Sequence, residues 1–85
     1  MKKINKKELA EILKEYFWLA NYEIITLGEK RIYINTLQFT IVLWYGSKYG
    51  WNYYVLGECT YLTSKYSLQL CERLEKSNNY YDNSK

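Results

Sequence analysis

LQFTIVLWYGSKYGWNYYVL, residues 37–56, predicts two β-strands joined by a tight turn, and the rest of the chain is arranged around this hairpin. Odd-numbered positions from Leu37 to Tyr45 are apolar and alternate with a less apolar even-numbered set, which is the period of a β-strand. We therefore expect the odd-numbered face to lie in the core. Gly46 and Gly50 bracket the reversal and supply the backbone freedom that a short turn requires. β-branched and aromatic residues dominate both halves, as is typical of a half-buried pleated surface.

Upstream of the hairpin the sequence predicts two more short strands. Residues 22–27 form one strand, Gly28 opens a tight turn, and residues 31–34 run back. Ile32 and Ile34 have even parity, whereas the next apolar set has odd parity, so a turn or a bulge is required near residues 35–36. We favour a turn, which gives four strands. A bulge would instead give a bent strand in a three-stranded meander.

Amphipathic helices are predicted on both sides of the strands. Asn5 and Glu8 have the spacing of a capping box at the start of the first helix, which we expect to end near residues 20–21. The second helix is expected to start near Thr63 and Ser64, which are good capping residues. Each helix has an apolar stripe at helical spacing. The stripe residues are Leu9, Ile12, Leu13, Tyr16, Phe17 and Ala20 in the first helix and Tyr66, Leu70, Cys71 and Leu74 in the second.

This order of elements predicts an α+β fold, a two-layer sandwich of helix, antiparallel β-meander with three or four strands, and helix. The 85 residues suffice for one domain, which we place at residues 1–76, followed by a flexible C-terminal tail at residues 77–85. The tail is polar except for Tyr80 and Tyr81, which offer a way for it to dock on the body. Both helices most economically pack on one sheet face. The other face would then meet solvent, a second subunit or a target.

The composition favours a folded protein without catalytic chemistry. Apolar residues make up 48% of the chain, and the net charge of +3 permits a nucleic-acid partner without demanding one. The chain has no His, the usual acid–base residue and metal ligand, and two Cys alone cannot close a structural zinc site. The four glycines do not form a phosphate-binding pattern. We therefore predict no enzyme activity, no metal and no cofactor.

The cysteines and the N-terminus indicate the compartment. Cys59 and Cys71 are too few for a disulfide framework, and we expect free thiols in a reducing cytosol. An amphipathic helix follows the basic N-terminal residues in place of an apolar run, so we expect no signal peptide. No stretch is long enough to span a bilayer, so we expect no membrane association. The expected location is the cytoplasm, in the host cell if a phage encodes the protein.

An excess of aromatic residues predicts a binding surface. Aromatic residues make up 19% of the chain, including 11 Tyr, which combine a large contact area with a polar tip. Between residues 32 and 57 the only ionised side chain is Lys48, so the predicted sheet is almost uncharged. Trp18 falls on the charged side of the first helix, where an exposed indole often marks a contact. The residues that we predict to bind a partner are Trp18, Trp44, Lys48, Tyr49, Trp51 and Tyr54.

These features favour a non-enzymatic protein-binding module. Abundant Lys, Ile, Asn and Tyr together with the absence of Pro fit an AT-rich bacterial or phage genome. We therefore hypothesise an inhibitor from a phage or mobile element that binds a host machine, in the manner of anti-CRISPR proteins, with a nucleic-acid-processing defence complex as its target. The protein would act as a monomer or a homodimer, and a purely structural homodimer is a further alternative.

Direct nucleic-acid binding is the other alternative. Aromatic residues beside basic ones, such as Tyr33 near Lys30 and Arg31, can stack on unpaired bases. The order helix, strands, helix also resembles the topology of the double-stranded-RNA-binding domain, and residues 63–65 lie where that domain begins its second helix with a basic cluster. Only one lysine of such a cluster is present here, so the resemblance is one of topology. The basic residues predicted for this alternative are Lys30, Arg31, Lys48 and Lys65.

Overall fold

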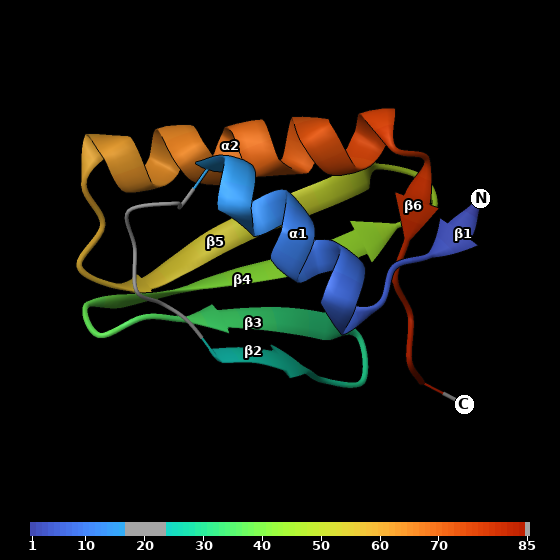
Figure 1. The fold of residues 1–85 in the computed structure, drawn as a ribbon, viewed down its shortest axis with the longest axis horizontal. Coiled ribbons are helices and arrows are strands. Elements are labelled where there is room, and N and C mark those ends of the chain that lie inside the picture. Colours follow the sequence, from blue (N-terminus) through green and yellow to red (C-terminus); the bar gives the residue numbers. More distant parts are fainter. Residues whose placement is uncertain (17–23, 85) are drawn as a thin grey trace.

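Two helices cover one face of a four-stranded antiparallel sheet (Figure 1). The computed structural model describes residues 1–16 and 24–84. The elements in chain order are β1 (Lys2–Lys3), α1 (Lys6–Tyr16), β2 (Ile24–Leu27), β3 (Arg31–Asn35), β4 (Phe39–Gly46), β5 (Gly50–Gly57), α2 (Tyr61–Lys76) and β6 (Asn79–Tyr80). This arrangement confirms the predicted α+β fold, in which an antiparallel meander separates two helices.

The sheet follows the order β2-β3-β4-β5, which confirms four strands and excludes the three-stranded alternative. The change of the apolar positions from even to odd numbers falls in a turn between Asn35 and Phe39, as predicted. The Thr36 hydroxyl closes this turn, because its Oγ1 donates to the Phe39 carbonyl at 2.8 Å and accepts from the Phe39 amide at 3.0 Å. Leu37, which we expected on the core face, lies in the turn and is 99% exposed.

The core lies between the sheet and the helices. Ile41 and Leu43 on the odd-numbered face of β4 are fully buried, as the alternation predicted. Leu9 of α1 and Leu70 of α2 belong to the same buried cluster, so both helices pack on this face. In Figure 1 the α1 ribbon crosses in front of the strands, and the α2 ribbon runs alongside β5. The expectation that the helices share one sheet face is confirmed.

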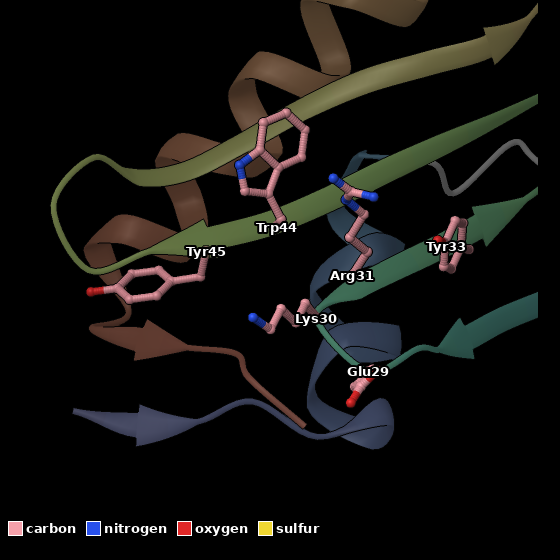
Figure 2. Close-up of a pocket in the computed structure, with 6 residues that line it drawn as sticks. All are labelled: Glu29, Lys30, Arg31, Tyr33, Trp44 and Tyr45. Carbon is pink, nitrogen blue, oxygen red and sulfur yellow. The ribbon is translucent and has the colours of Figure 1, made fainter. Parts of the chain in front are cut away.

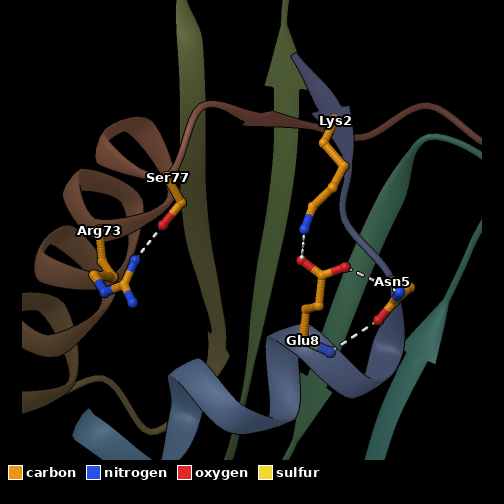
Figure 3. A network of polar contacts seen from close by, with 5 residues as sticks. All are labelled: Lys2, Asn5, Glu8, Arg73 and Ser77. Carbon is orange, nitrogen blue, oxygen red and sulfur yellow. Dashed lines mark hydrogen bonds and ion pairs between the residues drawn. The ribbon is translucent and has the colours of Figure 1, made fainter.

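Side-chain caps set the helix starts. Asn5 caps α1, because its Oδ1 accepts the Glu8 amide at 2.8 Å while its Nδ2 donates to the Glu8 carboxylate at 3.0 Å (Figure 3). Lys2 adds an ion pair to the same carboxylate at 2.6 Å. The predicted end of this helix at residues 20–21 and the stripe residues Phe17 and Ala20 lie outside the described residues.

The second helix starts earlier than the sequence predicted. Its N-cap is Thr60, whose Oγ1 accepts the amide of Thr63 at 3.2 Å, so the expected start at Thr63 and Ser64 is wrong. Thr63 is the third residue of the helix, and its hydroxyl accepts a hydrogen bond from the backbone amide of Thr60, which completes a capping box. Each threonine hydroxyl therefore accepts the backbone amide of the other threonine. A helix that began at Thr63 would not use this reciprocal pair of bonds as its cap.

The C-terminal residues pack on the body instead of fraying. β6 pairs in parallel with β1, and the Ile4 amide donates to the Tyr80 carbonyl at 3.0 Å. Tyr81 is 1% exposed, and its hydroxyl donates to the Gly28 carbonyl at the β2–β3 turn. The Asn83 amide reaches the same turn, at 2.6 Å from the Glu29 carbonyl. Residues 77–84, which we placed in a flexible tail after residue 76, thus contact the body through a buried ring and a two-stranded ladder, which is the docking that Tyr80 and Tyr81 offered.

This docking predicts that Tyr81→Ala lowers the free energy of unfolding by about 3 kcal/mol or more, as for other large rings removed from a core. Tyr61→Ala is the matched control, because Tyr61 is 78% exposed. We expect it to change stability by less than about 0.5 kcal/mol. Urea unfolding followed by circular dichroism measures both values, and equal small effects would show that the tail does not dock.

Candidate binding face

The sheet has a second face, opposite the helices, which we call the open face. Residues directly opposite one another in an antiparallel pair lie on the same side of the sheet. The register places Arg31 and Asn52 beside Trp44, and Tyr33 and Tyr54 beside Val42. The described residues of the open face are Thr26, Arg31, Tyr33, Asn35, Thr40, Val42, Trp44, Asn52, Tyr54 and Leu56.

Aromatic rings dominate the middle of the open face. The ring centroids of Trp44 and Tyr54 are 5.5 Å apart with 52° between the ring planes. Val42 is fully buried although it lies outside the main core cluster, because Tyr33 and Tyr54 flank it in the register. The guanidinium carbon of Arg31 lies 6.0 Å from the centroid of the Trp44 ring, within cation–π range. We call the rings of Tyr33, Trp44 and Tyr54 the aromatic ridge. Arg31 lies against it.

A polar row borders this ridge. The Thr40 hydroxyl donates to the Asn35 side-chain carbonyl at 3.1 Å, and the Asn35 side-chain amide donates to the Thr26 hydroxyl at 3.3 Å. These groups already satisfy one another, so a partner can cover them at a low desolvation cost.

A hollow of about 420 Å³ lies at the other end of the ridge (Figure 2). Trp44 and Arg31 lie side by side over the strands, and Lys30 and Tyr45 lie below them in the view of Figure 2. Glu29 lies at the lower margin of the same view. We call this cavity the Trp44 hollow. The residues that line it are Glu29, Lys30, Arg31, Tyr33, Trp44 and Tyr45.

The structure brings together residues that the sequence assigned to different hypotheses. Trp44 and Tyr54, predicted to bind a protein, share the open face with Arg31, predicted to bind nucleic acid, and Lys30 lines the hollow beside them. Tyr33, which the sequence suggested only for base stacking, lines the same hollow. The parity of β3 already indicated this position, because Ile32 and Ile34 point into the core and leave Tyr33 on the other side.

Other predicted contact residues lie elsewhere. Lys48 and Tyr49 form the tip of the β4–β5 hairpin, with the Lys48 ammonium 5.4 Å from the Tyr49 ring centroid. Lys65 is exposed on α2, in the other layer. Trp18 lies outside the described residues.

Trp51 is a correction to the predicted contact set. It is 6% exposed and faces the helices, because it pairs with Tyr45 on the odd-numbered face of β4. Its indole N–H donates to the Asn79 carbonyl at 3.0 Å, and its backbone amide donates to the Glu75 carboxylate at 2.5 Å. Trp51 therefore joins the sheet to α2 and the C-terminal segment and is not available to a partner.

The cysteines are both free, and Cys59 is exposed whereas Cys71 lies on the buried side of α2. Burial, with smaller contributions from the nearby carboxylates of Glu75 and Glu72, raises the pKa of the Cys71 thiol to about 12. Among the described residues, no group of three or more His, Cys, Asp or Glu side chains is arranged to hold a metal ion.

No family model, curated protein or solved structure matches this chain. Within residues 1–16 and 24–84, no helix combines the length and apolar character needed to cross a membrane.

The two thiols are expected to differ sharply in reactivity. A rise in the Cys71 pKa from 9.0 to about 12 lowers its thiolate fraction at pH 8 by about a thousandfold. The Cys71→Ala variant should therefore react with a thiol reagent at the rate of an exposed cysteine. The Cys59→Ser variant should react only after guanidinium unfolds it, and equal rates in the two folded variants would contradict the burial of Cys71.

Proposed function

We propose that this chain is a non-enzymatic protein-binding module and that the open face is its contact surface. The proposal depends on the composition of that face: its described residues include Tyr33, Trp44, Tyr54 and Arg31 but no Lys, Asp or Glu on the strands. Trp, Tyr and Arg are the residues enriched in binding hot spots, whereas Lys, Glu and Asp are depleted from interface cores.

The rigidity of this surface also supports the proposal. Trp44 and Tyr54 contact each other and stand on paired strands, so binding orders few additional side chains. Aromatic rings of this kind supply a large contact area with few rotatable bonds. Little of the favourable binding free energy is therefore offset by the loss of side-chain entropy at this surface.

The size and composition of the chain suggest the kind of partner. A chain with no His among these residues and with the residue usage of an AT-rich genome fits an inhibitor or adaptor from a phage or mobile element. We propose that its partner is a component of a host machine, such as a nucleic-acid-processing defence complex. Such an inhibitor works by occupying a surface and needs no chemistry of its own.

The decisive test is Trp44→Ala in a binding assay. A partner is first captured from a bacterial lysate and purified, and its affinity is then measured by calorimetry. Loss of a central hot-spot Trp should weaken binding by about 2 kcal/mol or more, which is about thirtyfold. Tyr61→Ala, an exposed ring on α2 in the other layer, should leave the affinity unchanged.

Two results would overturn the proposal. One is a Trp44→Ala variant that folds, as judged by circular dichroism, and binds every captured partner as tightly as the original chain. The other is a sedimentation coefficient that rises with concentration for the original chain but not for Trp44→Ala, because the open face would then join two copies of this chain.

Nucleic-acid binding remains the second candidate, because Lys30 and Arg31 lie beside Trp44 and Tyr33 in one hollow. It predicts that a single-stranded oligonucleotide binds at low salt. The affinity should fall roughly tenfold when the salt concentration rises fourfold, as expected for two or three phosphate contacts. Fluorescence anisotropy measures this dependence. No binding at low salt would exclude the candidate.

A further inference from the structure

The Trp44 hollow combines positive charge with an aromatic wall, and this combination identifies the chemistry of its occupant. We propose that it receives an acidic side chain, Asp or Glu, of the partner protein, next to an apolar or aromatic residue that packs against Trp44. This inference rests on the function proposed above and names the partner segment that the same face recognises.

The first observation concerns the two cations of the hollow. Lys30 and Arg31 are both exposed, and the ion pairs found in the described part of the chain, Lys2 with Glu8 and Arg73 with Glu15, involve neither of them. Two adjacent positive side chains without a salt-bridge partner attract a carboxylate.

The second observation is that the nearby acids do not cancel the charge of the two cations. Glu29 also lines the hollow, so the charged lining residues Lys30, Arg31 and Glu29 carry two positive charges and one negative charge, a net charge of +1. The Asp82 carboxylate accepts bonds from the Ser84 hydroxyl at 2.6 Å and the Ser84 amide at 2.9 Å. These bonds, with smaller contributions from Lys30 and Lys3, lower the pKa of Asp82 and show that its charge is already accommodated at the surface. The hollow therefore keeps a positive charge that a partner can neutralise.

The third observation is the position of Arg31. Its guanidinium lies against the Trp44 ring, with 6.0 Å between the guanidinium carbon and the ring centroid. A guanidinium that contacts a ring still has donors free for a carboxylate, and it loses less freedom than an unsupported side chain when it binds one. The Trp44 and Tyr45 rings bound the remaining space, so an apolar residue beside the acid would also find a contact.

A carboxylate from a protein fits this site better than a nucleic-acid strand does. Among the residues that the structure describes, the cations of the open face and its hollow are Lys30 and Arg31, and farther along the face the side chains of Thr40, Asn52 and Leu56 are uncharged. A strand of nucleic acid requires a track of cations and successive stacking platforms. The rings of Trp44 and Tyr54 are tilted by 52° and support each other, so they do not form two parallel platforms.

The test is a selection of random short peptides displayed on phage, performed in parallel on the original chain and on Trp44→Ala. We expect peptides that bind only the original chain to be enriched in Asp or Glu beside an apolar or aromatic residue. For a synthetic peptide from this set, replacing the acid by its amide should weaken binding at least about tenfold. The Lys30→Gln, Arg31→Gln double variant should show a similar loss, and the two changes together should cost little more than either alone.

The control is the Lys65→Gln, Lys76→Gln double variant, which removes the same charge from exposed positions on α2 and should bind the peptide normally. Peptides that depend on Trp44 but show no acid preference would overturn this inference and leave the proposed function standing. Peptides that bind Trp44→Ala equally well, or a selection without specific binders, would overturn both. Displacement of the peptide by a short oligonucleotide, with no effect of the amide replacement, would show that the hollow binds nucleic acid and not an acidic protein segment.

Discussion

The burial of Ile41 and Leu43 beneath two helices is the constraint on which the rest of the structure depends. In a strand, successive side chains point to opposite faces, so burying the odd-numbered side chains of β4 forces the even-numbered ones outward. Trp44 is therefore held on the open face by the packing of its neighbours. A shift of one residue in register would place Trp44 in the core and expose Leu43. A domain of this size buries too little apolar surface to offset that loss of stability.

The N-terminal and C-terminal segments extend this constraint to the end of the sheet. The Tyr81 hydroxyl and the Asn83 amide donate hydrogen bonds to the carbonyls of Gly28 and Glu29. These carbonyls belong to the turn that leads into Lys30 and Arg31. Trp51 connects β5 to α2 and to Asn79 from the other side. The aromatic ridge and the basic end of the hollow are thus supported by residues far away in the chain. A small domain gains by this arrangement, because residues outside the helices and sheet contribute to its limited core.

The open face places two kinds of residue together for one geometric reason. Trp44 and Arg31 are directly opposite in the β3–β4 ladder, so their side chains must share a face at close range. An arginine against an indole is favourable by itself and also leaves hydrogen-bond donors available. Protein binding and nucleic-acid binding draw on these same groups, and the uncharged remainder of the face is what favours a protein.

The sequence by itself determined the alternation of β4, the glycine turn at residues 46–50, the parity change before Phe39 and the apolar stripes of α1 and α2 within the described residues. Each is a local pattern whose period or turn chemistry is visible within a few residues. These patterns sufficed for the fold class, the four strands and the outward position of Trp44 and Tyr54. They did not suffice for the start of α2, since Thr60 and Thr63 are both good caps and only the reciprocal bonds between them select the first.

Only the tertiary structure decided which aromatic residues are buried in the core. Trp51 and Tyr81 have no neighbours in sequence that mark them as buried, and their burial depends on α2, Asn79 and Gly28, which are distant along the chain. The hollow likewise requires the turn after β2 to meet the end of β4, an encounter that the strand register sets. Local patterns therefore determined which face each side chain occupies, whereas contacts between distant segments determined what covers it.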